Sequence, residues 1–181
     1  MHHRGRDARE RRPWIAHERN DGRLGTALWP STATYLGVGP NPVDPTTGNV
    51  STTFPRGAAL ADWLVSVGAS PTRGSLQLFG TEFSVAGVAA PTLAWITESD
   101  PAAAAATRLL TFDTPVEAAA RNQCGRVGYV DLHVKSTAPA QNGKDTSDPT
   151  RPYPTGCQST ILTPQEQALE FMLFDIGACI Q

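Results

Sequence analysis

The sequence has few of the residues that mark catalytic or metal-binding proteins. It holds three cysteines in 181 residues, and their spacing fits neither a paired zinc motif nor a CxxC redox site. No serine stands in a GxSxG frame, and none of the cysteines falls at the strand–turn–helix elbow that amidotransferase-like enzymes use for their nucleophile. We therefore expect no bound cofactor and a domain that is not an enzyme by itself.

Long apolar runs are also missing. The run at 171–174 has four residues, whereas a membrane-spanning helix needs roughly 20. The charged start is not followed by the apolar stretch of a secretory signal. We expect no membrane span and no signal peptide in this sequence.

The net charge of −2 hides an uneven distribution. Residues 1–24 hold seven arginines and four acidic residues, whereas the rest of the sequence holds eight basic and thirteen acidic residues. A basic arm on an acidic body is one mark of nucleic-acid binding, but this arm has no helical apolar stripe and no aromatic residue except Trp14. We expect a disordered leader at 1–24 and no nucleic-acid partner.

Residues 25–56 are rich in Gly, Pro, Thr and Asn, which is typical of a surface loop or a linker. From residue 57 to residue 181 the pattern changes to short apolar segments that predict one α/β domain. A helix is expected at about 58–67, where Leu60, Trp63, Leu64 and Val67 share one face. Strands are expected at 76–79, 83–88, 109–112 and 126–134.

The last predicted element is a helix that begins after Thr163. Thr163, Pro164 and Glu166 provide a capping threonine, a proline at the first helical position and the glutamate of a capping box. Two apolar stripes follow, and we expect both to be buried, by a sheet and by something else; they contain Leu169, Phe171, Met172, Leu173, Phe174, Ile176 and Ala178.

The strand at 126–134 carries apolar side chains on both faces, as a central strand of a parallel sheet does. We therefore expect an α/β fold with a parallel, flavodoxin-like or amidotransferase-like sheet and the terminal helix packed on it. Three or four strands and two helices are fewer than such a fold needs. The sequence is therefore either a small, unusual α+β unit or the C-terminal part of a larger domain, and we favour the second.

Residues 125–133, GRVGYVDLH, resemble the last core strand of ThuA-like domains, a branch of the class I glutamine amidotransferase-like fold. Residues 83–88 are similar to the segment that precedes this strand in the same family. This resemblance implies a parallel sheet followed by a closing helix.

Four other segments resemble the C-terminal region of large, exported, multidomain bacterial surface proteins: 122–127, 131–134, 154–157 and 162–175. Those proteins have no assigned chemistry. The resemblance implies an extracytoplasmic or cell-surface setting, with other domains of a larger chain as partners. It favours a non-catalytic structural or ligand-binding module.

His133 and Asp131 are the candidate site residues. They are two positions apart on the predicted strand, so they share a face near its carboxyl end, where open α/β sheets bind their ligands. An acid that orients a histidine can make it a general base. The alternative function is therefore a fragment of an amidotransferase-like or hydrolase domain, whose nucleophile lies elsewhere; the other reading is a histidine hydrogen-bonded in the core.

The cysteines leave two possibilities open. One is a disulfide with a third, free thiol, and the other is three reduced thiols. For a disulfide we favour Cys124 with Cys179, because the start of a parallel strand and the end of its antiparallel helix lie at the same side of a sheet.

Overall fold

The computed structural model describes residues 14–17, 31–35, 45–81, 85–98, 106–132 and 162–178. Two α-helices and eight strands form within these ranges, with a short 3-10 helix at Ala120–Asn122. The helices are α2 (Pro55–Ser66) and α3 (Pro164–Ala178). The strands are β1 (Trp14–His17), β2 (Ala33–Tyr35), β3 (Thr46–Val50), β4 (Ser75–Leu78), β5 (Val85–Val88), β6 (Leu93–Glu98), β7 (Ala106–Thr114) and β8 (Gly125–Val130).

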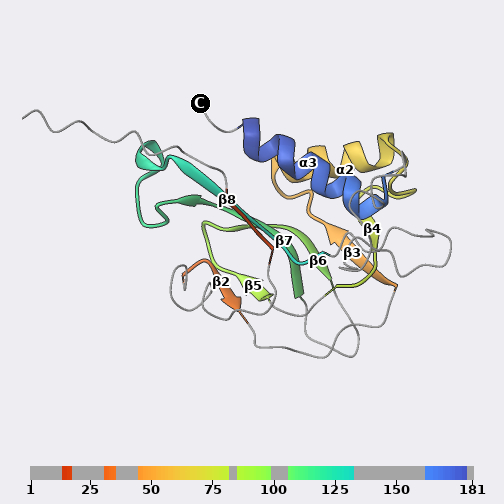
Figure 1. The fold of residues 1–181 in the computed structure, drawn as a ribbon, viewed down its shortest axis with the longest axis horizontal. Coiled ribbons are helices and arrows are strands. Elements are labelled where there is room, and N and C mark those ends of the chain that lie inside the picture. Colours follow the sequence, from red (N-terminus) through yellow and green to blue (C-terminus); the bar gives the residue numbers. More distant parts are fainter. Residues whose placement is uncertain are drawn as a thin grey trace, which may run out of the picture.

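Six of the strands form one sheet in the order β1-β8-β7-β6-β3-β4 (Figure 1). The five strands from β8 to β4 are antiparallel to their neighbours. β1 is added at the other side of β8 and runs parallel to it. β2 and β5 form a separate two-stranded antiparallel sheet.

The expectation of a parallel, flavodoxin-like sheet is wrong. Each pair of neighbouring strands from β8 to β4 runs antiparallel, and β8 pairs with β7 from Leu109↔Val130 to Thr114↔Gly125. The prediction took burial on both faces of β8 as a sign of parallel pairing. An antiparallel strand is also buried on both faces when both sides of its sheet are covered.

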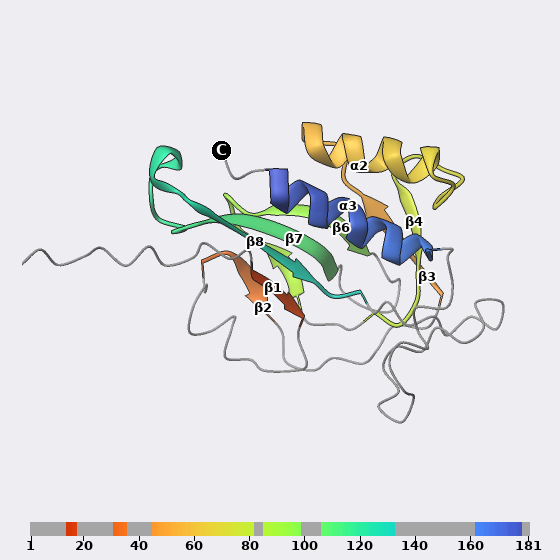
Figure 2. The same cartoon turned by 45° about the horizontal axis from the view of Figure 1, so that its top comes forward.

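Both sides of the sheet are covered here. α2 and α3 lie over one face, and the β2–β5 pair lies on the opposite side (Figure 2). Val127 and Tyr129 of β8 belong to the core on the β2–β5 side, whereas Val130 belongs to the core under the helices. β8 is an internal strand of the sheet, as its apolar pattern predicts, although it lies second from one edge.

The terminal helix α3 packs on the sheet, as expected, and its capping box is confirmed. The Glu166 N–H donates to Thr163 Oγ1 over 3.2 Å, and the Thr163 N–H donates to Glu166 Oε2 over 2.6 Å. Met172 and Ile176 are buried. The expected burial of both stripes is incomplete, because Leu173 is 49% exposed and Phe174 is 71% exposed.

Several strands lie where loops were expected. β1 falls within 1–24, and β2 and β3 fall within 25–56. β3 contains a Gly-Asn pair that resembles a turn, yet it pairs with both β4 and β6 through its backbone. A Cβ atom at Gly48 would lie 2.7 Å from Leu78 Cδ1, so the missing side chain lets the core close over this strand.

Candidate functional site

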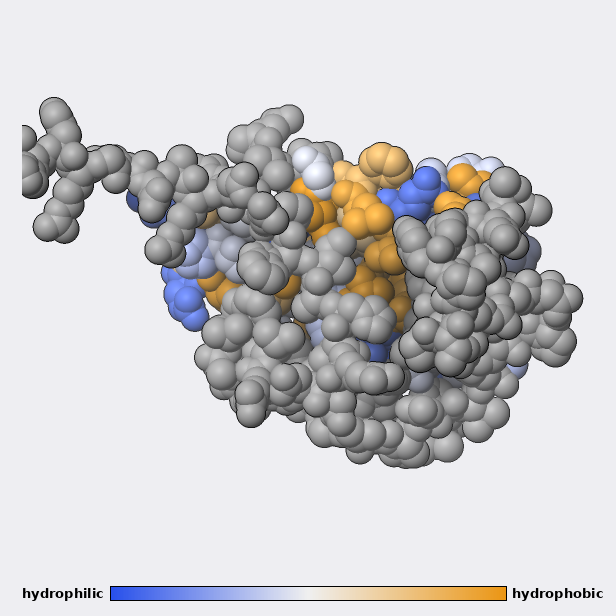
Figure 3. Space-filling view, in the orientation of Figure 1, coloured by the Kyte–Doolittle hydropathy of each residue, from blue (hydrophilic) through white to orange (hydrophobic). Residues whose placement is uncertain are grey.

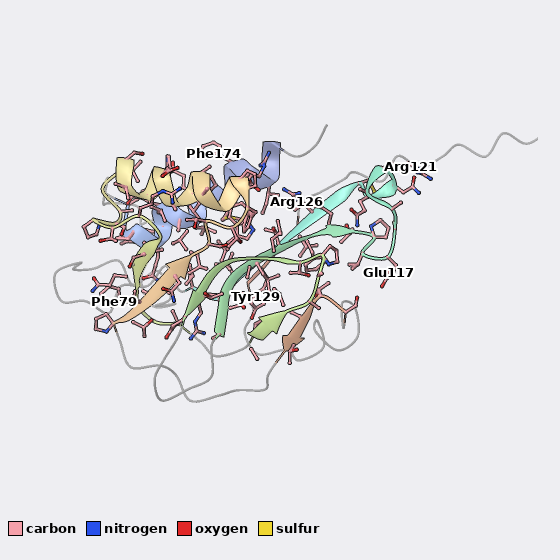
Figure 4. The ribbon with its side chains drawn as sticks, turned by 180° about the vertical axis from the view of Figure 1, so that it is seen from behind. Phe79, Glu117, Arg121, Arg126, Tyr129 and Phe174 are labelled. Atoms are coloured by element: carbon pink, nitrogen blue, oxygen red, sulfur yellow. The ribbon has the colours of Figure 1, made fainter. Side chains whose placement is uncertain are left out.

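Asp131 follows the last residue of β8 and is 7% exposed. It is two positions beyond Tyr129 of β8, and Tyr129 belongs to the core on the β2–β5 side. Side chains two positions apart on a strand point to the same face. Figure 4 shows Tyr129 on the side of the sheet away from the helices. His133 lies outside the described residues, so its pairing with Asp131 stays a prediction.

Asp131 pairs with a buried guanidinium group. Arg108 Nη1 lies 3.3 Å from Asp131 Oδ2, and Arg108 Nε lies 2.8 Å from Glu98 Oε2. The Thr81 hydroxyl lies 3.4 Å from the same Glu98 oxygen. We call Thr81, Glu98, Arg108 and Asp131 the buried ionic cluster.

The buried ionic cluster forms where three neighbouring strands meet. Glu98 ends β6, Arg108 is the third residue of β7, and Asp131 follows β8. The backbone also holds this corner together, because the Asp131 N–H donates to the Arg108 carbonyl over 2.8 Å. The antiparallel order of the sheet therefore brings together side chains that are far apart in the sequence.

Burial makes the ionic cluster energetically important. The side chains of Arg108 and Glu98 are 1% and 2% exposed. Removing one partner from a buried ion pair typically costs about 3–5 kcal/mol, because the remaining charge stays buried without compensation. Glu98 Oε1 is also buried, and no residue of the described ranges donates a hydrogen bond to it. Thr81, Glu98, Arg108 and Asp131 are therefore strongly coupled to folding.

A catalytic acid–histidine pair of Asp131 and His133 stays a prediction. In such a pair the carboxylate faces the imidazole and holds its orientation, and a nucleophile stands within hydrogen-bond reach. Here one carboxylate oxygen of Asp131 is engaged by Arg108. Cys124 lies before the opposite end of β8, seven residues from Asp131, which is roughly 20 Å along a strand.

A second group of charges joins the helices to the sheet, and sequence reasoning missed it. Arg126 of β8 donates from Nε to Asp113 Oδ1 over 2.7 Å, and its Nη1 lies 3.5 Å from Asp175 Oδ2. Arg56 of α2 pairs with the other oxygen of Asp175. Figure 4 shows Arg126 beside the end of α3. Asp175 is three positions after the buried Met172, so the two residues lie on the same side of α3. This spacing is the signal in the sequence that Asp175 faces the sheet.

The cysteine prediction is covered only in part. Cys124 is exposed and forms no disulfide within the part of the chain that the structure describes. Cys157 and Cys179 lie outside the described residues, so the bridge between Cys124 and Cys179 stays a prediction.

Within the described ranges, no three His, Cys, Asp or Glu side chains are grouped closely enough to hold a metal ion. None of the described helices has the length and apolar character needed to cross a membrane.

Comparison with known proteins found no matching protein family, no matching curated protein and no matching solved structure. The function must therefore be argued from the geometry of the chain itself.

Proposed function

We propose that this domain is a non-catalytic structural module of a larger, exported bacterial protein. The observation that carries the proposal is the buried ionic cluster. Asp131, the carboxylate that would have to serve His133, is engaged by Arg108 below the surface. A buried guanidinium between two carboxylates holds three strand ends together, which is a structural task.

The surface over the helices supports a setting with other domains. Apolar side chains gather over the two helices in the space-filling view (Figure 3). Phe174 is 71% exposed and Leu173 is 49% exposed, and both lie on α3. Large apolar side chains that are exposed next to each other typically mark a surface that contacts another protein or domain. The exported setting itself rests on the resemblance of 122–127 and 162–175 to bacterial surface proteins.

An activity screen tests the proposal against the enzyme alternative. The purified chain and a His133→Ala variant are incubated with p-nitrophenyl acetate, for ester hydrolysis, and with L-glutamine, for ammonia release. We expect the two proteins to show the same background rate with both substrates. Catalysis by His133 would instead appear as turnover in the parent chain that His133→Ala abolishes without changing the melting temperature.

An Asp131→Asn variant separates the structural role from the catalytic one. The amide keeps the size of the carboxylate and removes its charge, so the ion pair with Arg108 is lost. We expect a lower melting temperature and no change in either background rate. A variant that melts like the parent chain but loses a measurable turnover would contradict the proposal.

A further inference from the structure

The pairing between β6 and β7 contains two irregularities that offset each other. Ala94 is opposite Leu110, but the next β6 residue with a partner, Ile96, is opposite Leu109. The pairing thus passes over Trp95 on β6. The next pair joins Thr97 to Thr107, so the pairing passes over Arg108 on β7 and the original register returns. Each strand carries one extra residue, which is the definition of a β-bulge.

The first bulge changes which side chains enter the core. Neighbouring residues on a regular strand point to opposite faces. Trp95 and Ile96 are neighbours, yet both belong to the core under the helices and both are fully buried. Trp95 packs edge-on against Phe54 and Phe171, with ring centroids 5.0 and 6.3 Å apart. The bulge therefore lets two neighbouring large side chains enter the helix-side core together.

Both extra residues are held by polar contacts to neighbouring strands. The Trp95 indole N–H donates to Thr111 Oγ1 over 2.8 Å. Arg108 reaches Glu98 on β6 over 2.8 Å and Asp131 after β8 over 3.3 Å. The two residues that the pairing passes over thus both carry buried polar bonds to neighbouring strands.

We propose that the buried ionic cluster is a conformational lock that selects the bulged pairing of β6 and β7. The competing state is a regular pairing without bulges, in which Trp95 lies opposite Leu109 and Ile96 lies opposite Arg108. A regular ladder has no skipped residue, but it turns Ile96 away from the helix-side core. The ion pairs of Arg108 with Glu98 and Asp131 fix the bulged state.

In some proteins a buried polar or ionic group selects one arrangement of the chain, although it adds little to stability. Replacing a buried ionic triad by apolar residues of similar volume is often neutral or stabilising, whereas the charged triad tolerates few alternative geometries. Apolar side chains at the same positions would accept both registers. The lock concerns strand pairing and holds whether or not the domain is catalytic.

The test is a triple variant, Glu98→Leu/Arg108→Met/Asp131→Leu, of the full chain. Inter-strand backbone NOEs report the pairing directly. In the parent chain we expect Ile96 opposite Leu109. In the triple variant we expect NOEs that place Trp95 opposite Leu109, alone or mixed with the parent pattern. A folded triple variant that shows only the parent pattern would overturn the proposal.

A milder variant decides the question if the triple variant does not fold. Glu98→Gln keeps the side-chain size and an oxygen acceptor for Arg108, but removes the charge. We expect a second, weaker set of NOEs with Trp95 opposite Leu109, and a single set identical to that of the parent chain would reject the lock. Asp113→Asn is the matched control, because it removes a carboxylate that pairs with Arg126 at the other end of β7. It should leave the pairing of Ile96 with Leu109 unchanged.

Discussion

The residues that matter most at the residue scale are charged side chains inside apolar strands. Arg108 precedes the apolar run at 109–112 and is fully buried. In the sequence it looks like the polar boundary of a strand, and nothing local marks it as buried. For Asp131 the sequence suggests a partnership with His133. The structure pairs Asp131 with Arg108, because the antiparallel pairing of β7 with β8 sets the two residues opposite each other.

Arg108→Met tests the structural role of the buried ionic cluster. Methionine fills most of the arginine volume but cannot compensate Glu98 and Asp131. We expect the free energy of unfolding to fall by about 3–5 kcal/mol, measured by urea denaturation followed by circular dichroism.

Arg73→Met is the control for this measurement. Arg73 Nε lies 2.6 Å from Asp62 Oδ1 at the surface, and its hydrogen bond lowers the pKa of Asp62. Exposed ion pairs contribute little to stability, so we expect no measurable change in the denaturation midpoint. Equal denaturation midpoints for the two variants would show that burial does not increase the contribution of the buried ionic cluster to stability.

At the element scale, helices were the easier prediction. The expected helix at about 58–67 is α2, which begins three residues earlier at Pro55. The proline and capping box of α3 fix its start through local chemistry, and both operate as predicted. Strands were harder. The sequence analysis does not predict β6. The third residue of this strand, Trp95, is nevertheless fully buried.

Two helical glycines provide a matched test of local propensity against packing. Alanine is favoured over glycine in a helix by up to about 1 kcal/mol. Gly177 in α3 has open space around it, so Gly177→Ala should raise the melting temperature or leave it unchanged. At Gly57 in α2 a Cβ atom would collide with the Ser51 carbonyl oxygen and lie 2.8 Å from Phe54 Cζ.

We therefore expect Gly57→Ala to destabilise the chain by about 1–3 kcal/mol, despite its better helix propensity. Thermal denaturation of both variants measures the difference. If Gly57→Ala melts at or above the temperature of Gly177→Ala, the close packing between the start of α2 and residue 51 is not as the structure shows.

At the scale of the whole molecule, the layers explain why the sheet direction was mispredicted. α2 and α3 cover one face, and the β2–β5 pair covers the other (Figures 1 and 2). Asp175, which joins Arg56 of α2 to Arg126 of β8, fastens the helix layer to the sheet. None of these long-range pairings has a local pattern in the sequence.

The thiols test the proposed exported setting of the whole chain. If a disulfide forms in an oxidising compartment, non-reducing titration of the denatured, natively expressed protein should find one free thiol among the three cysteines. Pairing of Cys124 with Cys179 would appear as one linked peptide pair in a proteolytic digest analysed by mass spectrometry. Three free thiols would argue against the exported setting.

By itself, the sequence determined local features: the start of α3, the burial of Leu60 and Leu64 on α2, and the two-sided burial of β8. Each depends on residues within one or two turns of a helix or on alternation along one strand. Only the tertiary structure decided the antiparallel order, the bulges at Trp95 and Arg108, and the partner of Asp131. These depend on which strands become neighbours, and backbone hydrogen bonds between strands form with almost any side chains, so the sequence leaves the choice open.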